Sequence, residues 1–412
     1  MERTQVVVIG AGVAGLACAR EVDRLGHSVV VLEGRPRIGG RVLTHRTAGG
    51  LAELGAQVVH PTADLALNDL IGAAGMPLAP LERDADLVVV AAGQRWDSPS
   101  LIYSHPPPPW AVARALTGPG SVTECLRDLP EIPRALAALW VEQSVGGDCD
   151  GLDAGAVAAV ERARGGGVEA VLTAGFDTLA AALADRVDVR LGAPASVVQW
   201  GAAGVSVSGA VPITAAAVVV TVPPAVIQAA GLRFDPPLPP AKLAALSALA
   251  SVDAVSVALT AERPAERSTW ALFAEEPWGL WHSTAGSPIV VGHVKGPRAA
   301  VARKVTWSMS NASWLLHQLD PSLGAAIEVV SHDWGADLFA RGAHTMPTRG
   351  SEAGAFEWAR PLADVVFFAG EASAGHAGRG LVQGALSSGR RAAQEAVRAL
   401  GHGAPAATTS RE

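Results

Sequence analysis

The sequence predicts an α/β protein in which a discontinuous nucleotide-binding domain carries an inserted α+β domain. A β-α-β pattern with a glycine-rich turn occupies residues 5–33, strand-like segments fill 187–224, and a buried strand and a long helix close the chain at 364–400. Pieces of one domain at both ends and in the centre imply that the residues between them form a second domain. We expect the nucleotide-binding domain at 1–75, 185–265 and 345–412, and the substrate-binding domain at 76–184 and 266–344.

The composition favours a folded cytoplasmic protein without a metal site. Hydrophobic residues make up 49% of the chain and charged residues 17%, which is typical of a large buried core. The net charge is −7 without a cluster of basic residues, which excludes nucleic acid and anionic membranes as partners. No apolar stretch of about 20 residues indicates a membrane span. The three cysteines, Cys18, Cys125 and Cys149, are widely spaced, which favours a reducing compartment over disulfides or zinc.

The first 33 residues read as one β-α-β unit. Gln5–Ile9 is a short apolar run that suits a parallel strand buried on both faces. The turn Gly10–Gly15 follows, then a helix at Leu16–Leu25 and a second buried strand at His27–Glu33. A G-x-G-x-x-G turn between strand and helix, with an acid at the end of the next strand, is the Rossmann-like dinucleotide fingerprint.

Each residue of this fingerprint has a physical task. Gly10 allows the tight turn, Gly12 lets the backbone approach a pyrophosphate, and Gly15 lets helix and strand pack closely. The free N–H groups at the helix N-terminus attract the phosphates. Glu33 is expected to accept hydrogen bonds from a ribose, and Arg41, in the second glycine-rich turn, to pair with a phosphate. The alternative for Arg41 is a solvated loop arginine.

The elements between the two ends are less regular. Leu87–Ala92 is expected to be a strand, and alanine and leucine at helical spacing predict several helices from Val122 to Leu183. From Val187 the period changes to that of strands with tight turns, and a helix is expected near Leu243–Ala250. The strand Ser256–Thr260 and strand-like pieces between 270 and 305 complete the centre.

The motifs together resemble the flavin-containing amine oxidases, which include monoamine oxidases, polyamine oxidases and histone lysine demethylases. The fingerprint is followed by E-x-R-x-x-x-G-G-R, and Glu53–His60 (ELGAQVVH) resembles a block that lies along the flavin in that family. RLGAPASVVQW resembles the strand that contacts the adenine, and VVVTVPP another cofactor-side block. FFAGEASAGHAGRGLVQGALSSGRRAAQEAV resembles the closing motif of the family. The resemblance implies a discontinuous Rossmann-like FAD-binding domain.

The resemblance also implies which residues hold FAD. No cysteine lies near Ala343 or in the closing motif, where some relatives attach the flavin, so we expect FAD to be bound non-covalently. Leu381 and Val382 are expected at the flavin ring, and Gly384 and Gly389 keep the last helix close to the first β-α-β unit. The full set of expected contacts is Gly10, Gly12, Val13, Ala14, Gly15, Glu33, Gly34, Arg35, Gly40, Arg41, Val42, Leu54, Gly55, Ala56, Gln57, Ala195, Gly370, Glu371, Leu381, Val382 and Ala385.

The resemblance further implies removal of hydride from the C–N bond of an amine or amide, with electrons passed to dioxygen or another acceptor. Three positions depart from the family pattern. His344 stands where one aromatic wall of the amine site is usual, and Leu381 stands at the other. Ser256 stands, by gap-free counting, where a lysine usually assists the reaction with dioxygen, and neither Lys242, Lys295 nor Lys304 is a natural replacement.

These departures leave several readings open. His344 either acts as a base or only lines the pocket, and tryptophans are candidates for the missing aromatic wall: Trp270, Trp278, Trp281 and Trp307. The favoured function is oxidation of a specialised amine or amide, for example in secondary metabolism. The alternatives are a desaturase or isomerase of a carbon chain and a non-catalytic flavoprotein. A homodimer is an open expectation.

Overall fold

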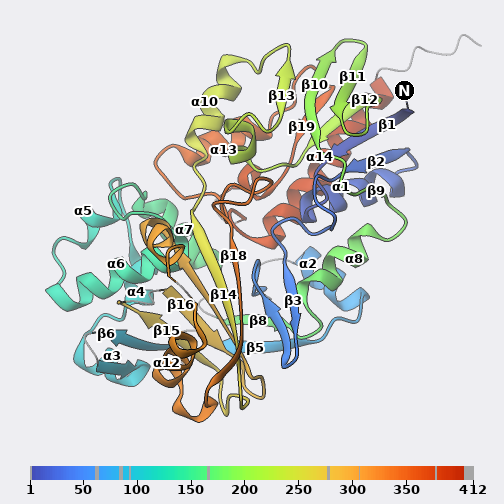
Figure 1. Cartoon of the computed structure of the whole chain (residues 1–412). Coiled ribbons are helices and arrows are strands. Elements are labelled where there is room, and N and C mark those ends of the chain that lie inside the picture. Colours follow the sequence, from blue (N-terminus) through green and yellow to red (C-terminus); the bar gives the residue numbers. More distant parts are fainter. Residues whose placement is uncertain are drawn as a thin grey trace, which may run out of the picture.

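Two large β-sheets organise the chain (Figure 1). The computed structural model describes residues 2–60, 65–82, 87–91, 94–164, 168–275, 279–305, 307–375 and 378–402. One sheet has eight strands and the other seven, and helices pack on both faces of each. The predicted α/β fold class is confirmed, with parallel strands at the centre of the first sheet and mainly antiparallel strands in the second.

The eight-stranded sheet contains the predicted β-α-β unit. β1 pairs in parallel with β2 on one side and β12 on the other, and β12 also pairs in parallel with β19 near the C-terminus. The order is β13-β10-β11-β12-β1-β2-β9. Its strands are β1 (Glu2–Ile9), β2 (Val29–Leu32), β9 (Asp188–Arg190), β10 (Ala195–Gly201), β11 (Gly204–Gly209), β12 (Ile213–Val220), β13 (Arg233–Asp235) and β19 (Val366–Phe368).

Strand β1 is apolar on both faces because both faces are covered. Val6 and Val8 pack with α1 (Val13–Arg24), α8 (Phe176–Ala184) and α14 (Val382–His402), whereas Val7 and Ile9 face α10 (Pro240–Ala248) and α13 (Ser351–Ala359). Smaller helices are α2 (Leu65–Ala73), α9 (Pro224–Gln228) and the 3-10 turn η4 (Glu371–Ser373).

Two glycines of α14 allow close approaches. A Cβ atom on Gly389 would lie 2.2 Å from the Ala14 carbonyl oxygen, so this glycine brings α14 against α1 as expected. A Cβ on Gly384 would lie 1.9 Å from the carbonyl oxygen of Gly378. Gly384 therefore packs on the preceding loop, which corrects the expectation that it faces the β-α-β unit.

The seven-stranded sheet has the order β18-β14-β17-β16-β15-β6-β7. Its strands are β6 (Leu87–Ala91), β7 (Gln94–Asp97), β14 (Ala254–Ala261), β15 (Thr269–Phe273), β16 (Gly279–Ser283), β17 (Ile289–Lys295) and β18 (Ala326–Asp333). Because β14 pairs with β17 and β18 in this sheet, we propose that the domain boundary lies before Ala254 rather than at 265.

Helices cover this second sheet as well. One face packs on α4 (Pro109–Ala115), α6 (Glu131–Val145) and α7 (Ala154–Ala163), and the other on α11 (Ala299–Ala302) and α12 (Met309–Leu319). The remaining short helices are α3 (Ser98–Ser104), α5 (Val122–Leu126), η2 (Gly296–Arg298) and η3 (Pro321–Leu323). Within the described ranges, no helix combines the length and apolarity that a bilayer crossing requires.

Two small antiparallel pairs complete the structure. β3 (Thr44–Thr47) pairs with β4 (Gly50–Glu53), and β5 (Leu78–Glu82) pairs with β8 (Val168–Leu172). The several helices expected between 122 and 183 are present, but the strand β8 among them was not predicted. Periodicity does not separate a strand from a helix segment in a short apolar run such as VEAVL, so pairing with β5 decides the outcome.

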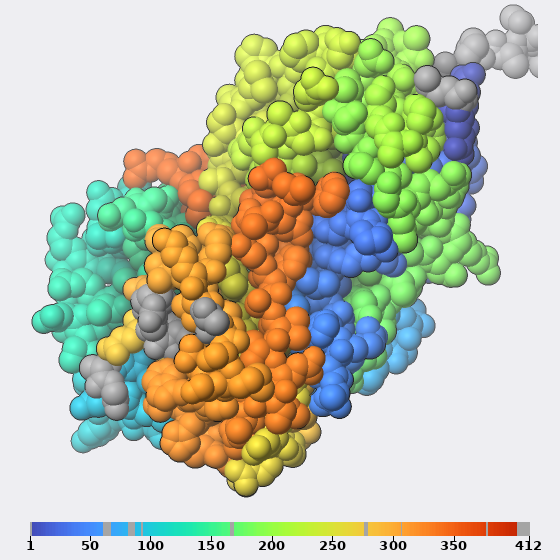
Figure 2. Space-filling view, in the orientation of Figure 1, coloured from blue at the N-terminus to red at the C-terminus, as the bar shows by residue number. Residues whose placement is uncertain are grey.

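The two sheets meet along the segment that follows β18. In the space-filling view this orange segment lies directly against the blue N-terminal segment (Figure 2). The contact includes a hydrogen bond between Arg35, just after β2, and Asp337, just after β18. Residues 302 positions apart therefore form one wall at the junction of the sheets.

Candidate active site

A cavity of about 510 Å³ is lined by residues from both sheets. Three of the expected site residues, Gly15, Leu54 and Ser256, do not line it. The other expected residues do: Gly10, Gly12, Val13, Ala14, Glu33, Gly34, Arg35, Gly40, Arg41, Val42, Gly55, Ala56, Gln57, Ala195, His344, Gly370, Glu371, Leu381, Val382 and Ala385.

The glycine-rich turns leave one edge of the cavity without side chains. Gly10 has φ of +108°, a conformation that favours glycine, and a Cβ on Gly15 would lie 1.9 Å from the Gly10 carbonyl oxygen. A Cβ on Gly40 would lie 3.0 Å from Gly12 Cα, so the two turns pack backbone to backbone. No side chain caps α1 at Gly12, which leaves its first N–H groups for a ligand.

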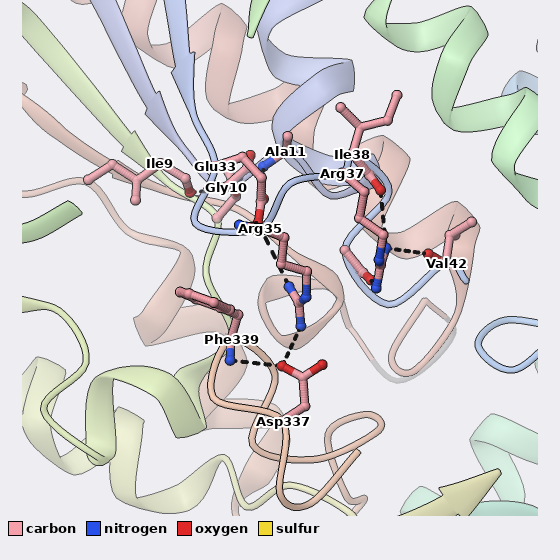
Figure 3. Close-up of polar contacts among 12 residues, drawn as sticks. Ile9, Gly10, Ala11, Glu33, Arg35, Arg37, Ile38, Val42, Asp337 and Phe339 are labelled. Atoms are coloured by element: carbon pink, nitrogen blue, oxygen red, sulfur yellow. Dashed lines mark hydrogen bonds and ion pairs between the residues drawn. The ribbon is translucent and has the colours of Figure 1, made fainter. Parts of the chain in front are cut away.

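Glu33 is held at the end of β2 by two backbone donors (Figure 3). Its Oε2 accepts from Ala11 N at 2.7 Å, and its Oε1 accepts from Arg35 N at 2.9 Å. The side chain is buried and lines the cavity. The two bonds orient the carboxylate for the ribose contact that the sequence predicts.

Arg41 and Glu371 join the two ends of the chain across the cavity. Arg41 Nη1 donates to Glu371 Oε1 at 2.8 Å and to the Ala343 carbonyl at 3.2 Å. Glu371 also accepts from Thr345 Oγ1 and from Gly380 N, each at 2.9 Å. Burial raises the pKa of Glu371, but the charge and hydrogen bond of Arg41, with His344 and the Gly380 N–H, together lower it below its ordinary value. Over the described residues, Arg41 Nη2 makes no hydrogen bond, which leaves it available to a phosphate.

A loop after β18 covers the nucleotide side of the cavity. Arg35 Nη2 donates to Asp337 Oδ1 at 2.6 Å, and both side chains are about 10% exposed (Figure 3). The Phe339 ring packs on Gly34, where a Cβ would lie 2.3 Å from it. Leu338, Phe339 and Arg341 of this loop also line the cavity. Sequence analysis missed these residues, although they lie only three to six positions before His344.

Asp337 makes several of the polar contacts that hold this loop. Besides Arg35, it accepts from Phe339 N at 2.9 Å and lies 3.1 Å from His332 Nε2. Burial raises the pKa of Asp337, but the hydrogen bonds from His332 and Arg35 outweigh it and hold the pKa well below its usual range. The carboxylate is therefore ionised at neutral pH.

His344 lines the cavity beside Gly380. Its Nδ1 lies 3.4 Å from the Thr345 carbonyl oxygen. Burial, with the nearby Lys295 charge, lowers the pKa of His344 to about 3. A neutral imidazole of such weak basicity is unsuited to deprotonating an ammonium group at neutral pH. Of the two readings of His344, the arrangement supports a wall residue over a base.

Ser256 lies behind the cavity wall rather than in it. It is fully buried, its Oγ lies 2.6 Å from His293 Nδ1, and it accepts from Trp334 Nε1 at 3.1 Å. The residue of β14 that lines the cavity is Ala254, two positions earlier. Counting along the family motif therefore misplaced this wall, and Ser256 is corrected from a contact residue to a buried support of its neighbours.

Lys295 lies in a place that the sequence analysis did not predict. It pairs with Ala254 across β14 and β17, and cross-strand partners share one face of a sheet. Lys295 lines the cavity, so it is a candidate for the lysine that counting along β14 did not find. Counting along the sequence of β14 cannot find Lys295, because this residue lies on the neighbouring strand β17.

The candidate tryptophans separate into different environments. Trp270 lines the cavity and stacks on His282, with ring centroids 4.7 Å apart. Trp281 is fully buried against Trp307, at 5.7 Å, and neither lines the cavity. Trp278 lies outside the described residues. Trp334, ten positions before His344, lines the cavity and was not among the candidates.

The part of the wall away from the glycine turns is buried and polar. Sequence analysis missed most of these residues, since only His60 belongs to a recognised segment, Glu53–His60. His60 Nδ1 lies 3.9 Å from Glu169 Oε1, with both side chains 2% exposed. The polar residues that line this part of the cavity are His60, Gln143, Ser144, Arg164, Glu169, His293 and Lys295.

Known relatives share this fold and these motifs. The chain is 32% identical over 274 residues to a protein named flavin-containing monoamine oxidase AofH in Mycobacterium tuberculosis, covering 57% of this chain and only 60% of that protein. It is 24% identical to polyamine oxidase 2 of Arabidopsis thaliana, covering 95% of this chain and 87% of the relative. Cyclohexylamine oxidase from Brevibacterium oxydans has a similar structure, with a TM-score of 0.79 at 20% identity over 97% of this chain and 99% of that one.

A variant of putrescine oxidase is also similar in structure, with a TM-score of 0.80 at 22% identity over 96% of this chain and 99% of that one. At such identities the structural likeness establishes the fold. The model of the family described as flavin containing amine oxidoreductase matches residues 13–109 and 114–397, which is most of the chain. The chain therefore belongs to the flavin-containing amine oxidoreductase family.

Proposed function

We propose that this protein is an FAD-dependent enzyme that removes hydride from the C–N bond of an amine. The observation that carries the proposal is a single cavity, in a member of this family, lined by both a dinucleotide-binding turn and a buried wall. The β-α-β unit that contains the turn contributes Gly10 and Glu33, and the wall contributes Trp270, His344 and Leu381.

The residues present fit FAD. Gly10, Gly12 and Gly40 give the pyrophosphate a surface free of Cβ atoms, and the uncapped start of α1 offers N–H groups. Glu33 is oriented for the ribose, and Arg41 for a phosphate. Ala195 is proposed beside the adenine, and Leu381, Val382 and Ala385 beside the flavin ring, since all four line the same cavity.

The arrangement supports dissociable FAD. Among the described residues that line the cavity, none is a cysteine. Cys18 is fully buried in the core around α1, and Cys125 and Cys149 pack on the core of the second sheet. A thiol in these positions is separated from the cavity wall, so we propose that FAD is retained by non-covalent contacts alone.

Bound flavin supplies a two-electron acceptor for the hydride beside the substrate nitrogen. The protein side chains position the amine and exclude water. Trp270 and Leu381 provide apolar surface, and His344 remains neutral at physiological pH because its pKa is lowered to about 3. We propose that His344 is a wall and hydrogen-bonding residue, and that the substrate enters as the neutral amine.

The electron acceptor is proposed to be dioxygen. Lys295 brings an ammonium group into the cavity wall opposite Ala254. A fixed positive charge in a water-poor site stabilises the anion formed when dioxygen takes up an electron. The sequence, with Ser256 at the usual lysine position, left open whether the acceptor is dioxygen or another molecule, and Lys295 favours dioxygen.

The test is an anaerobic absorbance titration of the FAD-loaded protein with primary, secondary and aromatic amines, followed by admission of air. We expect bleaching of the flavin by at least one class and rapid recovery in air. Bleaching with slow recovery would assign a dehydrogenase. Persistent flavin colour with all three classes would overturn the proposed reaction.

Three further properties are proposed with the function. A cytoplasmic location is supported by three cysteines that remain free thiols. A specialised substrate, such as an intermediate of secondary metabolism, is supported by the departures at His344 and Leu381. A homodimer is proposed from the resemblance alone, and sedimentation velocity tests it.

A further inference from the structure

We use the term second glycine turn for residues 39–42, which are fastened to the first glycine-rich turn. Gly39 N donates to the Ala11 carbonyl at 2.8 Å, and Val42 N closes the turn on the Gly39 carbonyl at 3.1 Å. Gly39 has φ of +97° and Gly40 has φ of +62°. Both values favour glycine, so the turn has a backbone shape that side chains would strain at two successive positions.

The guanidinium of Arg37 gathers the carbonyl groups of this turn and of the residue before it (Figure 3). Its Nη1 donates to the Ile38 carbonyl at 3.1 Å and to the Val42 carbonyl at 3.0 Å. Its Nη2 donates to the Gly40 carbonyl at 2.9 Å. Three carbonyl oxygens of one short segment are therefore directed at a single cation.

Two N–H groups of the turn have no such partner. Among the described residues, neither Gly40 N nor Arg41 N donates a hydrogen bond, and both residues line the cavity. Successive N–H groups in a turn form a concave anion-binding surface, often called a nest. The turn thus separates its acceptors, which Arg37 binds, from its donors, which remain for a ligand in the cavity.

Arg37 is a half-buried cation without a carboxylate of its own. It forms no ion pair with a described residue, whereas Arg35 pairs with Asp337 and Arg41 pairs with Glu371. Burial and the neighbouring charge of Arg35 lower the pKa of Arg37. A partly desolvated cation without a counter-charge destabilises a protein, and an anion held by the adjacent turn would supply that counter-charge.

We infer that Arg37 is a positioning residue for a phosphate group bound by the second glycine turn. Arg37 does not line the cavity, so it acts through the turn. It holds the carbonyl groups, so that the N–H groups of Gly40 and Arg41 face the phosphate, and its charge adds to the attraction. The inference rests on the proposed function, since the phosphate is one of the two in FAD.

The test compares ADP with adenosine on the full chain freed of FAD. The two probes share the adenine and the ribose, and only ADP carries a pyrophosphate. Calorimetry gives the dissociation constant of ADP, and ligand-detected NMR gives that of adenosine. In Arg37→Met we expect ADP to bind at least about tenfold more weakly, with adenosine changed by less than about twofold. Arg24→Met removes an exposed arginine that pairs with Glu21, and this control should leave both constants unchanged.

Arg37→Lys separates the charge from the geometry. Lysine keeps the positive charge but presents its donors from one nitrogen, so it meets the three carbonyls less completely than a planar guanidinium does. We expect its ADP affinity to lie between those of the wild type and Arg37→Met, with adenosine again unchanged. In the FAD-loaded proteins, release of the flavin, followed by its fluorescence, should be fastest in Arg37→Met and slowest in the wild type.

Salt dependence supplies a readout that a purely structural role would not change. Exposed and partly exposed charges attract an anion less strongly as salt screens them. Added salt should therefore weaken ADP binding more in the wild type than in Arg37→Met, which has one cation fewer beside the phosphate.

Three results would overturn the role of Arg37. The first is wild-type protein that binds ADP no more tightly than adenosine. The second is ADP affinity in Arg37→Met within about twofold of the wild type. The third is an equal loss of ADP and adenosine affinity, which would show that Arg37 only stabilises the fold.

A variant that does not fold leaves the test decidable. If Arg37→Met does not fold, the ratio of ADP to adenosine affinity in Arg37→Lys decides, and a ratio equal to that of the wild type would overturn the inference. Neither probe contains a flavin or an amine substrate. Failure of the amine titration would therefore leave this result intact, so the two proposals fail separately.

Discussion

The ion pair between Arg35 and Asp337 ties the loop after β18 to the nucleotide-binding domain. We predict that Asp337→Asn loosens this loop and weakens FAD binding. Asp337 receives Arg35 Nη2 at 2.6 Å and Phe339 N at 2.9 Å, and the pair is about 10% exposed. The low pKa of Asp337 means that its stabilising contribution is present above the ordinary aspartate pKa, so it is complete at pH 7.

The expected magnitude follows from burial. Removing one partner of a buried ion pair costs about 3–5 kcal/mol, and asparagine keeps one acceptor oxygen, so we expect a loss of about 3 kcal/mol of unfolding free energy. Leu338 and Phe339 line the cavity beside Gly34. A loosened loop must be ordered when FAD binds, so its dissociation constant should rise by about tenfold or more.

The assay is FAD titration of the apoprotein by fluorescence, together with urea unfolding at pH 7. The matched control is Asp188→Asn. Asp188 contacts Arg190 Nε at 2.6 Å, but those side chains are 46% and 39% exposed. Exposed pairs contribute less than about 1 kcal/mol. Equal effects of the two substitutions on the unfolding free energy and on FAD affinity would refute the role of Asp337 in holding the loop after β18.

Three further predictions test other parts of the structure. Glu33→Gln should raise the FAD dissociation constant by about tenfold or more. The glutamine NH2 would face the N–H of either Ala11 or Arg35, so one of these two donors would lose its acceptor. Fluorescence titration of the apoprotein with FAD checks it. Lys242→Met should lower the unfolding free energy by about 2–4 kcal/mol, because three carbonyls at the end of α13 lose their donor; urea unfolding beside the exposed Lys304→Met checks it. Burial lowers the pKa of His282 to about 4, so the unfolded chain takes up a proton at this residue at higher pH than the folded one does. The unfolding free energy should therefore fall between about pH 6.5 and pH 4, and up to about 3 kcal/mol of that loss should be absent in His282→Gln. Urea unfolding at both pH values checks it.

Local patterns carried much of the prediction. The strand, glycine turn and helix at 5–25 are contiguous in sequence, so their geometry follows from short-range sterics and helix-terminal N–H groups. The same holds for the closing helix, where Gly389 meets Ala14 as expected. For this reason most of the expected cofactor contacts, including Glu33 and Arg41, line one cavity.

Strand register accounts for what sequence analysis misplaced. Ser256 and Ala254 lie on the same face of β14, and only the curvature and neighbours of the strand decide which of them meets the cavity. Lys295 enters through pairing with Ala254, and β8 is a strand because β5 pairs with it. The sequence of a single segment does not predict these outcomes, because each depends on which strands pair and in which register.

The sequence by itself determined the dinucleotide-binding unit, the family resemblance and the residues of the glycine turns, because each depends on neighbours a few positions apart. Only the tertiary structure decided which residues of β14 and β17 line the cavity, the contact between Ser256 and His293, and the ion pair between Arg35 and Asp337. Those features join residues 37 to 302 positions apart. Their chemistry arises from burial and cross-strand contact, which exist only after the chain has folded.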